Sequence, residues 1–167
     1  MKVMKFGGTS VGTPQRMQDV AKLITSDGLP KLVVLSAMSG TTNTLVEISD
    51  YLYKKNPEGA NTIINRLEQK YHAHVEELYS TEEWKNKTLT FLHEEFDYLR
   101  SFTKVHFTSF EEKVILAQGE IMSTTMVTNY LLEQGVKTVL LRALDIVRTN
   151  QHADPAFNYL PEQYTQA

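Results

Sequence analysis

The sequence contains no cysteine, and this absence excludes several kinds of site at once. Without thiols there can be no disulfide framework, no thiolate metal centre and no cysteine nucleophile. Disulfide-free chains are typical of reducing compartments. We therefore expect a cytoplasmic protein.

Long apolar runs and an excess of basic charge are missing as well. No stretch approaches the roughly 20 apolar residues of a transmembrane helix, and the first residues lack the basic region and long apolar run of a signal peptide. With 17 basic and 20 acidic residues, the formal net charge is −3. We therefore expect neither nucleic acid nor a membrane as a partner.

The remaining composition is that of an ordinary globular chain. Its 167 residues are 41% hydrophobic and 22% charged. A chain of this length typically forms one domain and can bury a core.

The first third of the chain alternates short apolar runs with helical patterns. Residues 2–6 and 31–36 are predicted strands, and Thr13 with Pro14 predicts the start of a helix between them. A second helix is expected after Gly40. Strand, helix, strand, helix predicts an α/β fold with a parallel sheet. The nearly continuous apolar run 31–36 is typical of a strand covered on both faces.

The middle of the chain has helical periodicity throughout. Two patterns between Asn61 and about Phe102 predict a helical hairpin, inserted into the α/β unit at about 58–104. Ser80 and Thr81, followed by acidic residues, predict the start of its second helix.

The last part of the chain predicts one more helix and one more strand. A long helix is expected from about Phe110 to Leu132, ended by Gly135. Val136–Leu141 is predicted to be a third strand. Residues 154–167 have no strong period.

Adjacent glycines follow the first predicted strand. Gly7 and Gly8 would let backbone amides approach a ligand, and such amides at a strand-to-helix turn attract anions, phosphate above all. The spacing is neither G-x-x-x-x-G-K-[ST] nor G-x-G-x-x-G, so a plain tight turn is the alternative. Lys5 either points into the crevice where open α/β sheets bind ligands or extends to the surface.

A second candidate segment, residues 36–43 (SAMSGTTN), follows the second predicted strand. Its hydroxyls and the amides at the following helix start could bind an anion or a polar substrate. The alternative is helix capping by Ser39, Thr41 or Thr42.

Glu120 is the third candidate, because it is the only charged side chain between Val114 and Leu132. Apolar residues surround that predicted helix, so it should be buried on most sides. A buried carboxylate is costly unless it is paired. Glu120 should therefore either pair with an internal Lys or Arg or bind a cationic group of a ligand.

No metal site is predicted from side chains of this chain. His72 and His74 are two residues apart, so on a helix they diverge by about 200°. We expect both to be solvated.

Together, the three segments resemble one family. Lys5-Phe6-Gly7-Gly8-Thr9-Ser10-Val11 resembles the opening signature of the aspartokinases, in the amino acid kinase superfamily. Residues 36–43 resemble the second motif of that family, and Gly119-Glu120 with Met122-Ser123 resembles the third. The resemblance implies the N-terminal part of an amino acid kinase (carbamate kinase-like) fold: α/β, a mostly parallel sheet flanked by helices, with an inserted helical hairpin.

The resemblance also implies a reaction. Aspartokinases transfer phosphate from ATP, with Mg²⁺ held through the nucleotide, to the side chain of L-aspartate, giving 4-phospho-L-aspartate. This is the first step toward lysine, threonine and methionine. The implied catalytic residue is Lys5, the implied phosphate-binding residues are Lys5, Phe6, Gly7, Gly8 and Ser36, and the implied substrate-binding residues are Thr42 and Glu120. The complete protein is expected to be a homo-oligomer.

One further motif of the family, an arginine followed by glycines and Ser-Asp, is not found in this sequence. We therefore expect residues 1–167 to be the N-terminal, amino-acid-binding part of the catalytic domain. The nucleotide lobe and the regulatory ACT domains are expected to be absent, and the fragment alone to be inactive. The alternatives are another kinase of the superfamily and a non-catalytic aspartate-binding or assembly module.

Overall fold

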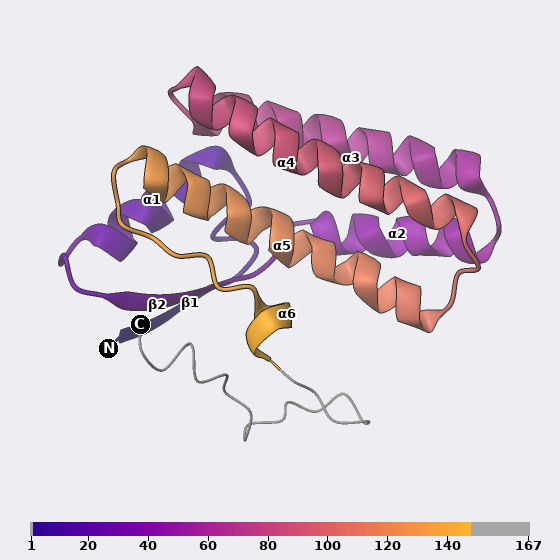
Figure 1. Ribbon diagram of the computed structural model, residues 1–167, viewed down its shortest axis with the longest axis horizontal. Helices are drawn as coiled ribbons and strands as arrows, with labels where there is room; N and C mark the ends of the chain where they lie inside the picture. The colour runs from indigo at the N-terminus through magenta and orange to yellow at the C-terminus, as the bar shows by residue number, and fades with distance from the viewer. Residues whose placement is uncertain (1, 148–167) are drawn as a thin grey trace.

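The computed structural model describes residues 2–147, so the predicted irregular tail at 154–167 lies outside the described residues. In chain order the elements are β1 (Lys2–Phe6), α1 (Pro14–Thr25), β2 (Lys31–Leu35), α2 (Thr41–Tyr53), α3 (Pro57–Leu78), α4 (Glu82–Ser101), the 3₁₀ turn η1 (Phe102–Lys104), α5 (Ser109–Glu133) and α6 (Ala143–Ile146). Their arrangement is shown in Figure 1.

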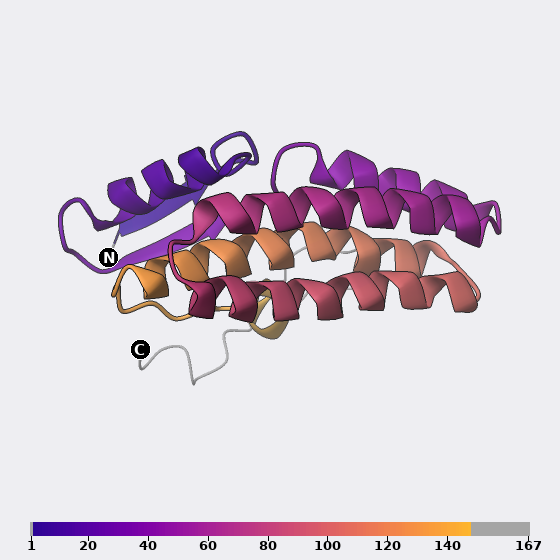
Figure 2. The ribbon, with the colours of Figure 1, turned by 90° about the horizontal axis from the view of Figure 1, so that it is seen from above.

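The two strands form a parallel sheet, which confirms the predicted α/β class. Lys2 pairs with Lys31, and Phe6 pairs with Leu35. Helix α1 connects the strands and lies along them (Figure 2). It begins as predicted, with Pro14 at its first position and the Thr13 hydroxyl accepting a hydrogen bond from the Arg16 amide.

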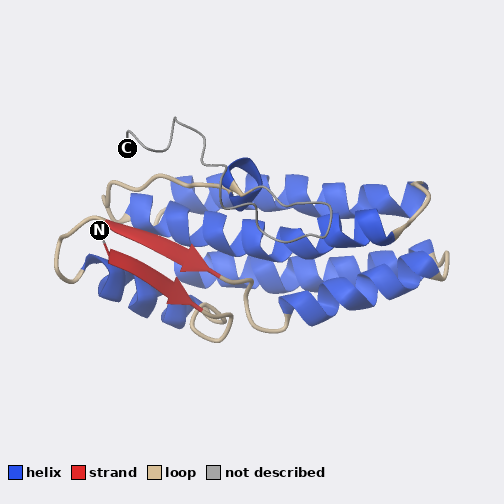
Figure 3. Ribbon diagram, turned by 90° about the horizontal axis from the view of Figure 1, so that it is seen from below, coloured by secondary structure: helices blue, strands red, loops and turns tan. Residues whose placement is uncertain are grey.

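The other face of the sheet is open within residues 2–147 (Figure 3). Val3 is 62% exposed and Val34 43% exposed. Lys5 pairs with Val34, and partners across a parallel ladder share a face, so Lys5 lies on this open face too. The prediction that residues 31–36 are covered on both faces is therefore wrong for the described part of the chain, since no helix there covers these valines.

The predicted third strand, Val136–Leu141, is not a strand in the structure. Helix α5 ends as predicted, just before Gly135, but the segment that follows is irregular, and Val139 is 75% exposed. A strand requires a ladder partner for its amide and carbonyl groups. No such partner is found between residues 2 and 147, so the apolar pattern alone does not make this segment a strand.

Four helices form a bundle beside the sheet (Figures 1 and 2). The two helices predicted between 61 and 102 are present as α3 and α4, and each packs against its neighbours in the ring α2, α3, α4, α5. Leu45, Tyr71, Phe96 and Met122 fill the interior and are almost fully buried. Each such side chain contributes about 1.5–3 kcal/mol by burial. No helix among residues 2–147 is long and apolar enough to cross a bilayer.

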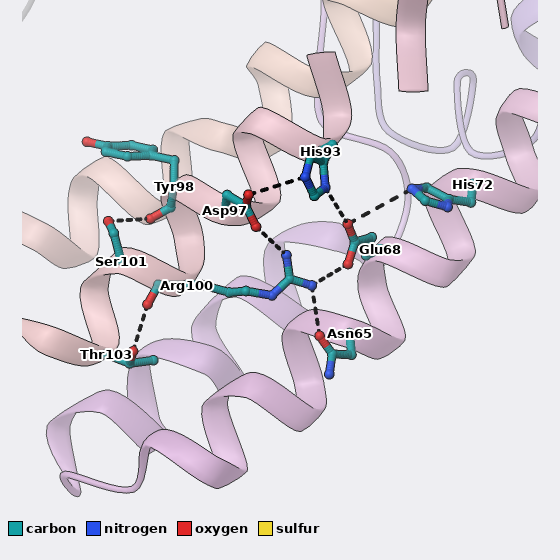
Figure 4. Close-up of polar contacts among 9 residues, drawn as sticks. All are labelled: Asn65, Glu68, His72, His93, Asp97, Tyr98, Arg100, Ser101 and Thr103. Carbon is teal, nitrogen blue, oxygen red and sulfur yellow. Dashed lines mark hydrogen bonds and ion pairs between the residues drawn. The ribbon is translucent and has the colours of Figure 1, made fainter. Parts of the chain in front are cut away.

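An arginine connects α3 to α4 at the surface of the bundle (Figure 4). Arg100 donates hydrogen bonds to Asp97 at 3.0 Å, to Asn65 at 2.8 Å and to Glu68. His72 lies at the edge of this cluster, with Nε2 4.0 Å from a Glu68 carboxylate oxygen. These contacts set the two helices of the hairpin side by side.

The hydrogen-bond donors at the start of α4 are paired with a side chain from another helix. A carboxylate oxygen of Glu133, at the end of α5, accepts hydrogen bonds from the Ser80 amide (2.9 Å), the Thr81 amide (2.8 Å) and the Thr81 hydroxyl (2.9 Å). The helix begins where the sequence predicts, but the Thr81 side chain makes no capping hydrogen bond of its own. Glu133 of α5 thus adds an anion to Glu82 and Glu83, which lie in the first turn of α4 at its positive end.

Helix α5 approaches the turn after β2 closely at Gly119. A Cβ at this position would lie 2.8 Å from the Ala37 Cβ, 3.3 Å from a Thr41 methyl and 3.4 Å from Leu45. Real Cβ atoms do not reach the first distance, so only glycine fits without a shift. The contact places α5 directly behind the turn.

Gly119→Ala should destabilise the chain by up to about 2 kcal/mol, measured by urea unfolding. The added methyl gains about 1 kcal/mol of helix propensity, but overpacking costs about 1–3 kcal/mol. Ala37→Gly removes the opposing methyl, so it should restore part of the loss in the double variant. Strict additivity of the two changes would contradict the contact.

Glu133→Ala should lower the free energy of unfolding by about 1 kcal/mol, because three donors at the start of α4 lose their acceptor. Glu77→Ala is the control: Glu77 is exposed and forms no hydrogen bond or ion pair within residues 2–147. Equal unfolding midpoints for the two variants would show that the contact does not stabilise α4.

Candidate functional site

Two loops meet where the parallel strands end. The loop 7–13 leaves β1 and the turn 36–40 leaves β2, and parallel strands place these ends at the same edge of the sheet. The Ser36 amide donates to the Phe6 carbonyl at 3.1 Å, and the Ser39 amide donates to the Gly8 carbonyl at 3.1 Å. The first two motifs are therefore in direct contact through their backbones.

The adjacent glycines have different roles in this contact. A Cβ at Gly8 would lie 2.6 Å from the Ala37 carbonyl oxygen, so the approach of the two loops requires glycine there. A Cβ at Gly7 would meet nothing within 4 Å. The Gly7 carbonyl accepts from Ser10 at 2.9 Å, which is a tight turn. The amides of Gly7 and Gly8 donate no hydrogen bond within residues 2–147, so neither donor has an acceptor there.

The third motif lies against the second. The buried Ser123 hydroxyl donates to the Ser36 carbonyl at 2.7 Å, one helical turn beyond the contact of Gly119 with Ala37. All three motifs that carry the family resemblance therefore come together at one edge of the sheet. Ser36 itself is half-buried between them.

Lys5 is exposed at the end of β1, on the open face of the sheet. In the described part of the chain its ammonium forms neither a hydrogen bond nor an ion pair. It precedes the free Gly7 and Gly8 amides by only two and three residues. One cation and two backbone donors are thus available at this end of the loop.

Glu120 is exposed, so the prediction of a buried carboxylate is wrong. Helix α5 is buried on most sides, as expected, but Glu120 occupies the side that its neighbours leave open. The prediction failed because apolar residues around a helical wheel do not exclude one solvated position. The carboxylate forms no side-chain hydrogen bond or ion pair within residues 2–147, so its charge is free to act on a ligand.

The start of α2 follows the turn and lies beside Gly119 of α5. Gly40 is its N-cap and no side chain caps the helix, so the capping interpretation of Ser39, Thr41 and Thr42 is not what the structure shows. The buried Thr41 hydroxyl lies 3.1 Å from the Tyr71 hydroxyl. Thr42 is exposed beside it.

Tyr71 links the core of the bundle to this site. Burial raises its pKa well above the usual range, and the nearby charge of Glu120 raises it further, while the hydrogen bond with Thr41 opposes both. Tyr71 is therefore a neutral phenol at physiological pH. Glu120 directly follows Gly119, where a Cβ would lie 3.3 Å from a Thr41 methyl, so Glu120 comes from the part of α5 that contacts the start of α2.

Sequence reasoning missed three side chains that hold these loops. Arg16 donates to the Thr9 carbonyl at 2.8 Å, and Lys70 donates to the Ser39 carbonyl at 3.1 Å. His74 is half-buried, with Nε2 3.4 Å from the Gly12 carbonyl, so the prediction that it is solvated is wrong. No motif marks Lys70 or His74, because each reaches a segment more than 30 residues away. The one signal in the sequence is their spacing of four residues. This spacing puts Lys70 and His74 on one side of a helix, where both can contact the same region of the fold.

Among residues 2–147 no three His, Asp or Glu side chains gather as a metal site would need. The hydrogen-bond donors at the edge of the sheet are amides, hydroxyls and an ammonium, which suit an anion, and the Glu120 carboxylate beside them suits a cationic group.

Comparison with known proteins supports the fold and the motifs together. The amino acid kinase family matches residues 1–165. The bifunctional aspartokinase/homoserine dehydrogenase 1 of Arabidopsis thaliana is 26% identical over 165 residues, which are 93% of this chain and 18% of that protein. The aspartokinase of Chlamydia trachomatis is 27% identical over 148 residues, which are 89% of this chain and 32% of that protein.

A solved structure shows the same arrangement. Escherichia coli aspartokinase III, in a complex with aspartate and ADP, superposes with a TM-score of 0.81 at 26% identity, covering 99% of this chain and 37% of that one. The chain thus spans well under half the length of each of these relatives. The resemblance to aspartokinases is confirmed along nearly its whole length, and the chain belongs to the amino acid kinase family.

Proposed function

We propose that the protein containing this chain is an aspartate kinase, which transfers the γ-phosphoryl group of ATP to the side-chain carboxylate of L-aspartate. The observation that carries the proposal is the meeting of the three motifs at one edge of the sheet, with their charged residues open. The E. coli relative, described with aspartate and ADP, supports this choice of substrates.

The glycine loop would serve the phosphate. A carboxylate oxygen of aspartate attacks the γ-phosphorus while the bond to the bridging oxygen of ADP breaks, so negative charge spreads over the transferred group. Lys5 would neutralise that charge, and the open amides of Gly7 and Gly8 would hold its oxygens. Phe6 and Ser36 complete this set, since the Phe6 carbonyl accepts the hydrogen bond that sets Ser36 beside the loop.

The start of α2 and the open side of α5 would serve the amino acid. The exposed Thr42 hydroxyl can hydrogen-bond the substrate, and the carboxylate of Glu120 can pair with its α-ammonium group. The cation of Lys5 matches the anionic phosphates of ATP, and the carboxylate of Glu120 matches the α-ammonium group of aspartate.

In the complete protein we expect a metal, a nucleotide lobe and an assembly of several copies. Mg²⁺ would be held through the phosphates of the nucleotide and would offset their charge. Residues 1–167 would be the amino-acid-binding part of the catalytic domain, and a nucleotide lobe supplied by the complete protein would finish the site. The complete protein would be a cytoplasmic homo-oligomer in the synthesis of lysine, threonine and methionine.

Lys5→Met should lower kcat of the complete protein by about 100-fold or more, because one preorganised charge on the transferred group is lost. The measurement is ADP release coupled to NADH oxidation, with L-aspartate as acceptor. Lys2→Met, an exposed lysine on the same strand, is the control and should leave kcat unchanged. The 167-residue chain alone should release no ADP. Equal rates for the two lysine variants would contradict the assignment of Lys5.

Glu120→Gln should raise the KM for aspartate by about tenfold or more and leave the KM for ATP unchanged, because a charge-assisted contact to the ammonium is lost. The same assay measures both constants, and Glu77→Gln is the matched control. Equal rises in both KM values would show that Glu120 acts on the structure of the site rather than on the amino acid. Turnover with another carboxylate or a carbamate, and none with aspartate, would overturn the proposed acceptor.

A further inference from the structure

One turn of α3 contacts both loops of the site. Lys70 and His74 are spaced i and i+4, so they lie on one face of the helix, and Tyr71 is next to Lys70 on the buried side. Lys70 reaches the Ser39 carbonyl at 3.1 Å, Tyr71 lies 3.1 Å from the Thr41 hydroxyl, and His74 Nε2 lies 3.4 Å from the Gly12 carbonyl.

The His74 contact joins α3 to the end of the glycine loop. The two ring nitrogens face carbonyl oxygens, with Nδ1 2.8 Å from the Lys70 carbonyl and Nε2 toward Gly12. The Lys70 carbonyl lies within the helical ladder, whereas the Gly12 carbonyl accepts no other hydrogen bond within residues 2–147. Both nitrogens face acceptors, so both contacts are hydrogen bonds when each nitrogen carries a proton. The proton on Nε2 then satisfies a carbonyl that otherwise has no partner in the described part of the chain.

The Lys70 contact fixes the entry to α2. Gly40, the N-cap of α2, has a φ of +82°, and no side chain makes a capping hydrogen bond at this helix start. A Cβ at Gly40 would lie 3.9 Å from the Lys70 nitrogen, which shows how closely the lysine covers this turn. By binding the Ser39 carbonyl, Lys70 orients the residues that lead into Thr42.

We propose that Lys70 and His74 are positioning residues, which hold the glycine loop and the turn 36–40 at a fixed separation against α3. This inference rests on the proposed phosphoryl transfer, in which one loop holds the phosphate and the other leads to the acceptor. Transfer between two bound groups depends steeply on their distance, and a misplacement of about 1 Å can cost about 100-fold in rate. Neither residue touches the reacting atoms.

Paired substitutions of the complete protein test the proposal. In His74→Gln the side-chain amide takes the place of Nε2 and can still donate to Gly12, whereas in His74→Asn it takes the place of Nδ1 and cannot reach. Lys70→Arg keeps a donor, whereas Lys70→Met keeps only the stem. His72→Asn, two residues away and exposed, is the control.

We expect kcat to fall by about tenfold or more in His74→Asn and Lys70→Met, with both KM values nearly unchanged, and to be largely retained in His74→Gln, Lys70→Arg and His72→Asn. Amide hydrogen exchange of residues 8–13 should rise in His74→Asn, and that of residues 37–41 in Lys70→Met. Exchange in α4 and α5 should not change in either variant.

The two readouts separate this proposal from the proposed function. Absence of aspartate phosphorylation by the wild-type protein would overturn the function, while the exchange pattern would still test the positioning of the loops. The positioning itself is overturned if His74→Asn and His74→Gln behave alike in exchange and in kcat. It is also overturned if the fall in kcat is accompanied by faster exchange throughout the bundle, since that indicates a merely structural role.

Discussion

The site depends on one close approach of backbones. Gly8 lies so near the Ala37 carbonyl that a Cβ would come within 2.6 Å of it, and a Cβ at Gly119 would come within 2.8 Å of the Ala37 Cβ. Two glycines that are more than 100 residues apart thus let a loop, a turn and a helix converge. The hydrogen bonds between the loops, and from Ser123 to the turn, are possible only at this separation.

The bundle supports this convergence from behind. Helices α2 and α5 each pass from the core of the bundle to the edge of the sheet, so their packing against α3 and α4 sets where the turn and the third motif lie. Tyr71 is fully buried and edge-to-face with Phe96, yet its hydroxyl meets Thr41 at the start of α2. The helical hairpin is therefore joined to the site by side chains of α3 rather than merely attached beside it.

The site has an exposed charged side chain at each of its two ends. Lys5 lies at the carboxyl end of β1 and Glu120 on the uncovered side of α5, and both are exposed. Their separation on different elements keeps the two charges available to different ligand groups. Under the proposed reaction, this arrangement receives an anionic phosphate at one end and a cationic ammonium at the other, with the hydroxyl of Thr42 beside the second.

The sequence by itself determined what depends on near neighbours. The start of α1 at Pro14, the end of α5 before Gly135 and the class of the fold follow from capping residues and periodicity, which act within a few positions. The order of the three motifs also followed, because a motif is read directly along the chain.

Only the tertiary structure decided what depends on partners far along the chain. Residues 136–141 have a strand pattern, but no ladder partner meets them within residues 2–147. Glu120 is solvated and His74 half-buried, the reverse of what was predicted, because the position of neighbouring helices sets their exposure. Glu133 caps a helix that begins some 50 residues before it. Local propensity cannot foresee such contacts, because their energy comes from groups that only folding brings together.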